Sequence, residues 1–262
     1  MDASSPPVPF PNVERVNPAG TAPVVLVCDH AGLQLPEPYG RLGLHETELA
    51  RHIGWDIGAA AVTRRMAELL DAPAVLSLYS RLLVDCNRAI DDPTFICEVS
   101  DGTVVPSNRG LDAAERQKRI DTFFTPYHAA IAEAVAAAQK VAPSPTLLSI
   151  HSFTPVMKGR ARPWHVGILW DQDPRLAQPL IEILAEDGEL VVGDNEPYSG
   201  RDGSGYTMKR HAEAAGFPHA LVELRQDLVA DADGVERWAR RLSGAMTRIL
   251  AEHGPFKVEK FI

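Results

Sequence analysis

The sequence lacks several features that would place it in a class at once. Its 262 residues include only three cysteines, Cys28, Cys86 and Cys97, an odd number without CxxC spacing. This pattern argues against a disulfide framework and against a cysteine-rich structural zinc site, and it favours a reducing compartment such as the cytoplasm. The sequence also has no run of about 18 apolar residues, which a transmembrane helix would need. We therefore expect a cytoplasmic protein without a membrane-spanning segment.

The N-terminal residues and the net charge exclude further classes of segment and of binding partner. Residues 1–7 lack the basic start and the apolar stretch of a secretory signal, and their prolines predict that residues 1–20 form an N-terminal arm. The formal net charge of −9 argues against nucleic acid or an anionic membrane surface as a partner. A small anionic substrate is still compatible with this charge, because a local cluster of arginines can override a weak overall field.

Familiar catalytic and nucleotide-binding motifs are missing as well. The sequence has no Walker loop, no HExxH and no GxSxG motif. The glycine-rich stretch at residues 200–205 does not lead directly from a strand into a helix, so it does not favour a dinucleotide site. Residues 193–205 carry four glycines and no regular pattern, which is typical of a flap over an active site.

Strand and helix patterns alternate along the whole chain, and 45% of its residues are hydrophobic. This order predicts a single α/β domain over residues 1–262, built as a three-layer αβα sandwich around a mostly parallel mixed sheet. Buried strands are expected at 24–28, 74–78, 82–85, 146–150, 165–170, 190–192 and 219–224. Helices are expected at 46–70, 111–141 with a break at Pro126, 174–186, 206–215 and 233–252.

Two predicted strands are each followed by a histidine. His30 comes after the strand at 24–28, and His151 comes after the strand at 146–150. The carboxyl ends of parallel strands form the edge at which α/β folds bind their ligands, so both imidazoles are expected at one site. Imidazole is the commonest metal ligand in proteins, although a single histidine at a strand end more often only caps its strand.

Asp56 lies among apolar residues in the middle of the predicted helix 46–70. A carboxylate in such a place is costly unless it is paired or bound to a metal, and the alternative is a half-exposed residue on a tightly packed helix. Gly54 and Gly58 weaken a helix and are therefore expected to permit a close approach of another segment. His52, on the same predicted helix, is expected at the surface.

Residues 80–88 place Arg81 and Arg88 on either side of an apolar strand that ends in polar residues, including Asn87. Guanidinium groups suit the capture of a carboxylate or the stabilisation of an oxyanion, and the alternative is a pair of structural salt bridges. Cys86, next to Arg88, could serve as a nucleophile in a different class of hydrolase, but no His–Asn motif accompanies it.

Glu223 interrupts the apolar strand at 219–224. If its side chain is buried, desolvation raises its pKa into the range that suits a general base. The alternative is an outward-facing glutamate on an alternating strand.

Taken in order, these segments resemble the N-formylglutamate amidohydrolase family, which is similar in fold and metal chemistry to the zinc carboxypeptidase and aspartoacylase group. The resemblance covers about residues 20 to 250. It rests on CDHA at 28–31 with Pro36, HIGWDIG at 52–58, SRLLVDCNR at 80–88, SIHS at 149–152, GYT at 205–207 and VEL at 222–224.

The resemblance implies a mononuclear Zn²⁺ site with His30 and His151 as ligands. In the carboxypeptidase group, a glutamate three residues after the first histidine is also a ligand, but here that position is Leu33. The third ligand is therefore expected to be Asp56, with Asp29 as the alternative.

The resemblance also implies hydrolysis of a small anionic N-acyl amino acid, with N-formyl-L-glutamate giving formate and L-glutamate. Glu223 would be the general base, and Arg81 would stabilise the oxyanion. Arg88, Asn87 and Tyr206 would bind the substrate, with residues 193–205 closing over it. The alternatives are a zinc amidase for another N-acyl amino acid or a small peptide, and a metal-free binding protein on the same fold, which only Leu33 favours.

Overall fold

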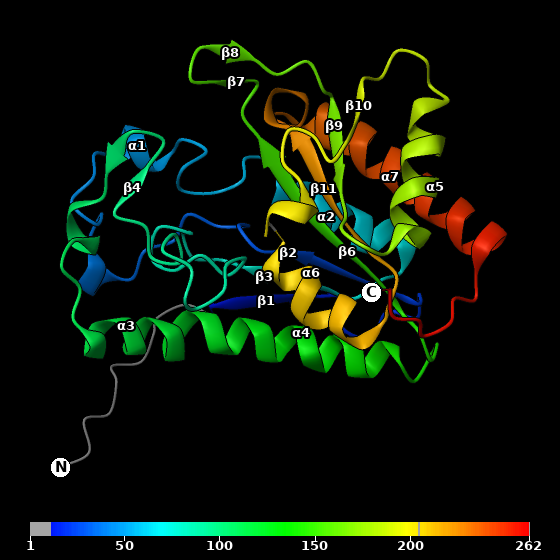
Figure 1. Ribbon diagram of the computed structural model, residues 1–262, viewed down its shortest axis with the longest axis horizontal. Coiled ribbons are helices and arrows are strands. Elements are labelled where there is room, and N and C mark those ends of the chain that lie inside the picture. The colour runs from blue at the N-terminus through cyan, green and yellow to red at the C-terminus, as the bar shows by residue number, and fades with distance from the viewer. Residues whose placement is uncertain (1–11, 204, 262) are drawn as a thin grey trace.

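The computed structural model describes residues 12–203 and 205–261, and its centre is a seven-stranded sheet with helices on both faces (Figure 1). The strands lie in the order β1 (Val13–Val16), β3 (Ala74–Ser77), β2 (Val24–Cys28), β6 (Thr146–Phe153), β11 (His219–Arg225), β9 (Val166–Leu169) and β10 (Val192–Asp194). The helices are α1 (Glu46–Leu49), α2 (Ala59–Leu70), α3 (Ala113–Arg119), a π-helical turn (Ile120–Phe124), α4 (Thr125–Ala138), α5 (Pro174–Ala185), α6 (Tyr206–His211) and α7 (Ala232–His253).

The four central strands, β3, β2, β6 and β11, are parallel. The edge strand β1 runs antiparallel to β3. On the other side of the sheet, β9 runs antiparallel to β11, and β10 runs parallel to β9. Two short hairpins lie outside this sheet, β4 (Val99–Ser100) with β5 (Thr103–Val104) and β7 (Val156–Met157) with β8 (Arg160–Ala161). The prediction of a mostly parallel mixed sheet is therefore confirmed. The described part of the expected N-terminal arm contains the edge strand β1, and residues 1–11 lie outside the described residues.

Strand β2 shows why the sequence forms three layers. All five of its residues are buried, because helices cover both faces of a central parallel strand. Val24, Leu26 and Cys28 pack in the apolar layer under α2, α5 and α7, whereas Val25 and Val27 pack in the layer under α4 and α6. The predicted three-layer αβα sandwich is confirmed. Among the described residues, no helix is both long and apolar enough to cross a membrane.

A third apolar cluster packs beside the sheet, and it corrects the strand predicted at 82–85. Leu82 and Leu83 are fully buried there with Phe95 and Phe124, but residues 82–85 form a turn and a loop. An apolar run indicates burial, and in this case a loop is buried. The break predicted at Pro126 is replaced by the π-helical turn, which runs directly into α4, with the proline in the first turn of α4.

The single helix predicted over 46–70 is wrong, because the chain forms α1, then a loop at 50–58, and then α2. Gly58 adopts a positive φ of 83°, and a Cβ there would lie 2.3 Å from the carbonyl oxygen of Val229. At Gly54 a Cβ would lie 2.2 Å from the carbonyl oxygen of Leu49. The two glycines do permit close approach, but in a loop and not in a helix, and only Gly58 has a backbone conformation that L-residues rarely adopt. This loop carries Asp56.

Candidate active site

Two buried histidines lie at the carboxyl edge of neighbouring strands. His30 follows the end of β2 by two residues, and His151 lies inside β6, which runs to Phe153 and is thus longer than the strand predicted at 146–150. Each residue is 2% exposed, and the ring centroids are 4.9 Å apart. Because β2 and β6 pair in parallel, the sheet itself brings these imidazoles together, as the sequence predicted.

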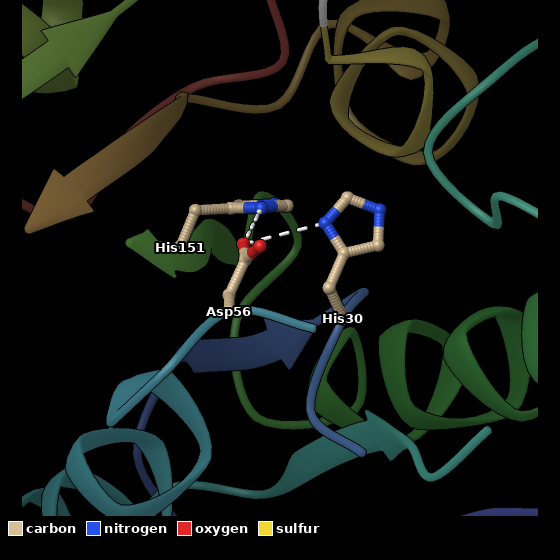
Figure 2. Close-up of side chains that lie close together, drawn as sticks. All are labelled: His30, Asp56 and His151. Atoms are coloured by element: carbon tan, nitrogen blue, oxygen red, sulfur yellow. Dashed lines mark hydrogen bonds and ion pairs between the residues drawn. The ribbon is translucent and has the colours of Figure 1, made fainter. Parts of the chain in front are cut away.

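The carboxylate of Asp56 lies between the two rings (Figure 2). Its Oδ2 atom is 2.7 Å from Nδ1 of His151 and 3.3 Å from Nδ1 of His30. The loop that carries Asp56 is tied to the first histidine, since the Asp56 amide donates to the His30 carbonyl at 3.0 Å. Asp56 is 3% exposed and lies two residues before Gly58, so it is not in the middle of a helix as the sequence analysis had it.

Nε2 of each ring, the nitrogen that faces away from Asp56, contacts a further carboxylate. Nε2 of His30 is 2.7 Å from Oδ1 of Asp85, and Nε2 of His151 is 2.8 Å from Oδ2 of Asp29. A carboxylate only accepts, so Nε2 of each ring donates to its outer carboxylate, and Nδ1 of the protonated His151 donates to Asp56. A metal ion that displaced this proton would find the Nδ1 lone pairs of both rings available as ligands. Carboxylate–imidazole pairs of this kind orient the histidines of metal sites and make them more basic.

Nδ1 of His30, Nδ1 of His151 and Oδ2 of Asp56 form a donor set that fits a zinc ion. The ligand atoms of His30, Asp56 and His151 lie within 4.8 Å of one another, and all three side chains are buried. Two imidazole nitrogens and one carboxylate oxygen are a ligand set that catalytic zinc sites use, with a fourth position left open. Burial opposes the charged form of His151, but hydrogen bonds to Asp29 and Asp56 outweigh it and raise its pKa to about 10. The site therefore attracts positive charge.

Glu223 faces the same site from β11, where it is the register partner of His151. It is 7% exposed, and its Oε2 atom has no hydrogen-bond partner in the described part of the chain. Burial raises the pKa of this carboxyl group to about 7, although the nearby His151 acts in the opposite direction. A carboxyl group that titrates near neutrality can both accept and donate a proton.

Three further polar side chains predicted for the site also line it. Arg81 donates to Oδ2 of Asp85 at 2.6 Å and lies 3.5 Å from Oδ1 of Asp56. Oδ1 of Asn87 accepts the Thr207 amide proton at 3.0 Å, so its NH₂ group remains available as a donor. Arg88 is half-buried, and no ion pair with it is recorded among the described residues.

These groups surround one cavity of about 140 Å³. Its walls are His30, His52, Asp56, Arg81, Asn87, Arg88, His151, Ser152, Phe153, Thr154, Leu169, Tyr198, Leu221 and Glu223. His52 was expected at the surface, but the loop at 50–58 turns it toward this cavity. Its pKa is lowered by burial.

The profile of the N-formylglutamate amidohydrolase family matches residues 22–230 of the chain. The chain belongs to this family. The gene product Atu2144 from Agrobacterium tumefaciens is 37% identical, with a TM-score of 0.88 over 92% of this chain and 95% of that one. N-formylglutamate amidohydrolase from Ralstonia eutropha JMP134 is 22% identical, with a TM-score of 0.71 over 92% of this chain and 97% of that one. No curated protein matches the chain.

In this N-formylglutamate amidohydrolase family member, Asp29 does not replace Asp56 as the third inward carboxylate. Besides His151, the Asp29 carboxylate accepts from the hydroxyls of Tyr127 at 3.0 Å, Ser149 at 2.9 Å and Thr207. Four donors occupy its acceptor sites, an arrangement that suits a group orienting His151 better than a metal ligand. The sequence pattern offered no signal for this network, because its members are spread over four elements.

Tyr206, which was predicted to bind the substrate, is not among the residues that line the cavity. Its ring lies 6.0 Å from the ring of Phe124 and 5.6 Å from that of His128, because the first turn of α6 packs toward α4. The segment 193–205 instead contributes Tyr198, whose hydroxyl accepts a hydrogen bond from Arg162 at 3.0 Å. Sequence reasoning missed this residue, although it lies in the segment predicted to be a flap.

The cysteine alternative has no geometric basis. Cys86 does not line the cavity, and its Sγ atom lies 3.7 Å from the hydroxyl of Ser77. Burial raises the pKa of the Cys86 thiol, which disfavours the thiolate that a nucleophile needs.

Proposed function

We propose that the chain is a zinc-dependent amidohydrolase that converts N-formyl-L-glutamate and water into formate and L-glutamate. The observation that carries this proposal is the convergence of His30, Asp56 and His151 on one point beside Glu223, with Arg88 at the wall of the same cavity. Family membership supports the amidohydrolase class, and the donor set supports zinc. The 140 Å³ of the cavity supports a small acyl group such as formyl.

A zinc ion at this site supplies Lewis acidity, which activates water at neutral pH and polarises an amide carbonyl. The side chain of Glu223 accepts a proton from the attacking water and passes it to the nitrogen of the leaving amine. Its pKa of about 7 suits both transfers, because the group exchanges a proton near neutrality with little energetic cost.

Two arginines act on different parts of the substrate. Arg81 is fixed by Asp85, and its remaining N–H groups stabilise the oxyanion that develops on the carbonyl oxygen. Arg88 binds the α-carboxylate of the substrate, with the NH₂ group of Asn87 as a further donor. This local positive charge allows an anionic substrate to bind a protein with a net charge of −9. All three cysteines are free, which supports the further proposal that the enzyme works in the cytoplasm.

The test is the metal content of the purified protein, measured by elemental mass spectrometry for the wild type and His151→Ala in parallel. We expect about one zinc per wild-type chain and its loss in His151→Ala, with His45→Ala as the matched control because His45 is exposed. Absence of metal from the wild type after incubation with zinc would refute the proposal. A panel of N-formyl and N-acetyl amino acids then distinguishes formylglutamate hydrolysis from a broader amidase activity.

A further inference from the structure

A second pocket of about 400 Å³, which is half open to solvent and is called the outer chamber here, adjoins the cavity that holds the catalytic groups. The two spaces share the side chains of His52, Arg81, Arg88 and Tyr198, so a ligand can extend from one into the other. The outer chamber is further lined by Ile53, Leu82, Asp85, Thr94, Cys97, Val99, Ser100, Asp101, Gly102, Met157 and Lys158. Residues from the β4–β5 hairpin and the β7–β8 hairpin thus both line it.

The charges around the outer chamber do not cancel. Its two acidic residues are engaged, since Asp85 bonds to Arg81 at 2.6 Å and Asp101 bonds to Arg51 at 2.8 Å. Within residues 12–203 and 205–261, no ion pair is recorded for Lys158 or Arg88, which also line it. The outer chamber therefore has an excess of positive charge, in a protein whose overall charge is negative.

The positions of Arg88 and Lys158 indicate where each of two substrate carboxylates would bind relative to the scissile amide. Arg88 borders both chambers, so it can reach a carboxylate attached close to the scissile amide. Lys158 lines only the outer chamber, at the tip of the β7–β8 hairpin. A ligand that spans both positions carries two carboxylates separated by a short chain, and Met157 and Val99 provide apolar contacts for that chain.

We propose that the outer chamber binds the side-chain carboxylate of a dicarboxylic N-acyl amino acid, and that Lys158 is the residue that selects it. This inference rests on the proposed function and names the determinant of substrate choice. A lysine ammonium at the chamber wall stabilises an ionised carboxylate but gains little from the neutral amide of the same shape. Lys158 does not line the cavity that holds His30, Asp56, His151 and Glu223, so it is expected to affect substrate binding and not the chemical step.

The experiment compares N-formyl-L-glutamate with N-formyl-L-glutamine, which differ only in the charge of the side chain. Steady-state kinetics are measured for the zinc-loaded wild type, Lys158→Gln and Arg160→Gln. Arg160 is a matched control, because it lies on the same hairpin, is exposed and does not line the chamber. In Lys158→Gln we expect KM for formylglutamate to rise about tenfold while its kcat and both constants for formylglutamine stay unchanged.

Arg160→Gln is expected to keep the wild-type preference for formylglutamate. An unchanged preference for formylglutamate in Lys158→Gln would overturn the inference. An equal loss of this preference in Arg160→Gln would also overturn it, because it would reflect only the overall positive charge of the hairpin. If the wild type hydrolyses neither compound, the proposed function fails, and calorimetric titration of both compounds decides the inference separately. Tighter binding of formylglutamate that disappears in Lys158→Gln supports it, and equal affinities in the wild type refute it.

Discussion

Glu223 and His151 are register partners in the parallel strands β11 and β6, and both side chains face the same cavity. The backbone hydrogen bonds of the central sheet therefore fix a carboxyl group that titrates near neutrality beside an imidazole directed at Asp56. Residues on strands are positioned more rigidly than residues on loops, which suits groups that must act on the same substrate atom.

The first prediction concerns this carboxyl group. Glu223→Gln keeps the size of the side chain but removes its ability to exchange a proton. We expect kcat to fall by about 10²- to 10⁴-fold while the zinc content stays at the wild-type level. Activity assays and elemental analysis of the same preparation test this, with Glu37→Gln as an exposed control. Loss of zinc together with activity would make Glu223 a ligand and contradict the proposed role.

The second prediction is the pH dependence of the reaction. Glu223 must be ionised to accept a proton, and its pKa is raised to about 7. We therefore expect kcat/KM to increase as the pH rises through about 7, where the carboxylate forms. The residual activity of Glu223→Gln should lack this limb when measured over the same range. An acid limb that persists unchanged in the variant would show that another group titrates.

The third prediction concerns the groups behind His151. Tyr127→Phe removes one of the four donors to Asp29, which in turn orients His151. We expect zinc affinity, measured by competition with a chelator, to fall about 10- to 100-fold. Tyr206→Phe is the matched control, since Tyr206 lies outside the cavity and its loss of a hydroxyl should change neither zinc affinity nor KM. Equal affinities of wild type and Tyr127→Phe would contradict this argument.

The fourth prediction separates the two arginines of the site. Arg88→Gln removes a cation from the cavity wall without breaking a recorded ion pair, so we expect KM to rise about 10- to 100-fold and kcat to change little. Arg81→Gln leaves the buried Asp85 without its arginine partner, and we expect kcat to fall and the protein to unfold at a lower denaturant concentration. A rise in KM alone for Arg81→Gln would argue against its role at the oxyanion.

The fifth prediction concerns a pair of histidines between α4 and α6. Nδ1 of His128 is 2.9 Å from Nε2 of His211, and burial lowers the pKa of His128 to about 3 and that of His211 to about 4. In the unfolded chain both would titrate near 6.5, so between that value and about 4 the unfolded state binds more protons. The stabilisation that this histidine pair contributes should therefore be greatest above pH 6.5 and be lost progressively as the pH falls.

The size of this effect is up to about 1.4 kcal/mol per pH unit for each histidine. Urea denaturation at several pH values measures it, and His128→Gln should show a shallower decrease because the amide takes up no proton. His253→Gln is the control, since His253 is exposed at the end of α7. Identical pH dependence in the wild type and His128→Gln would contradict the prediction.

The central strands could be predicted from the sequence because burial on both faces leaves continuous apolar runs, as in β2 and β6. Their carboxyl ends then identified the neighbourhood of His30 and His151. The break between α1 and α2 could not be predicted, because the apolar spacing continues across it. The loop is decided by tertiary contacts such as the approach of Gly58 to Val229, which no local pattern reveals.

The partners of the imidazoles were beyond prediction for a similar reason. Asp85 is the last residue of the strand predicted at 82–85, and no local pattern predicts its contact with His30, which joins positions 55 residues apart. Asp29 was considered as a ligand because it adjoins His30, whereas the structure directs it to the other histidine. Tyr206 was placed in the site by its motif, although Tyr198 occupies the cavity wall.

Two consecutive residues after β2 thus act on different halves of the centre, since His30 contacts Asp56 while Asp29 holds His151. A small shift of this one turn would misalign both imidazoles together. The orientation of His30 and that of His151 are therefore expected to change together. Substitutions that disturb the turn, such as a larger residue at Gly32, where a Cβ would lie 1.8 Å from the Leu78 carbonyl oxygen, should abolish zinc binding rather than weaken it by degrees.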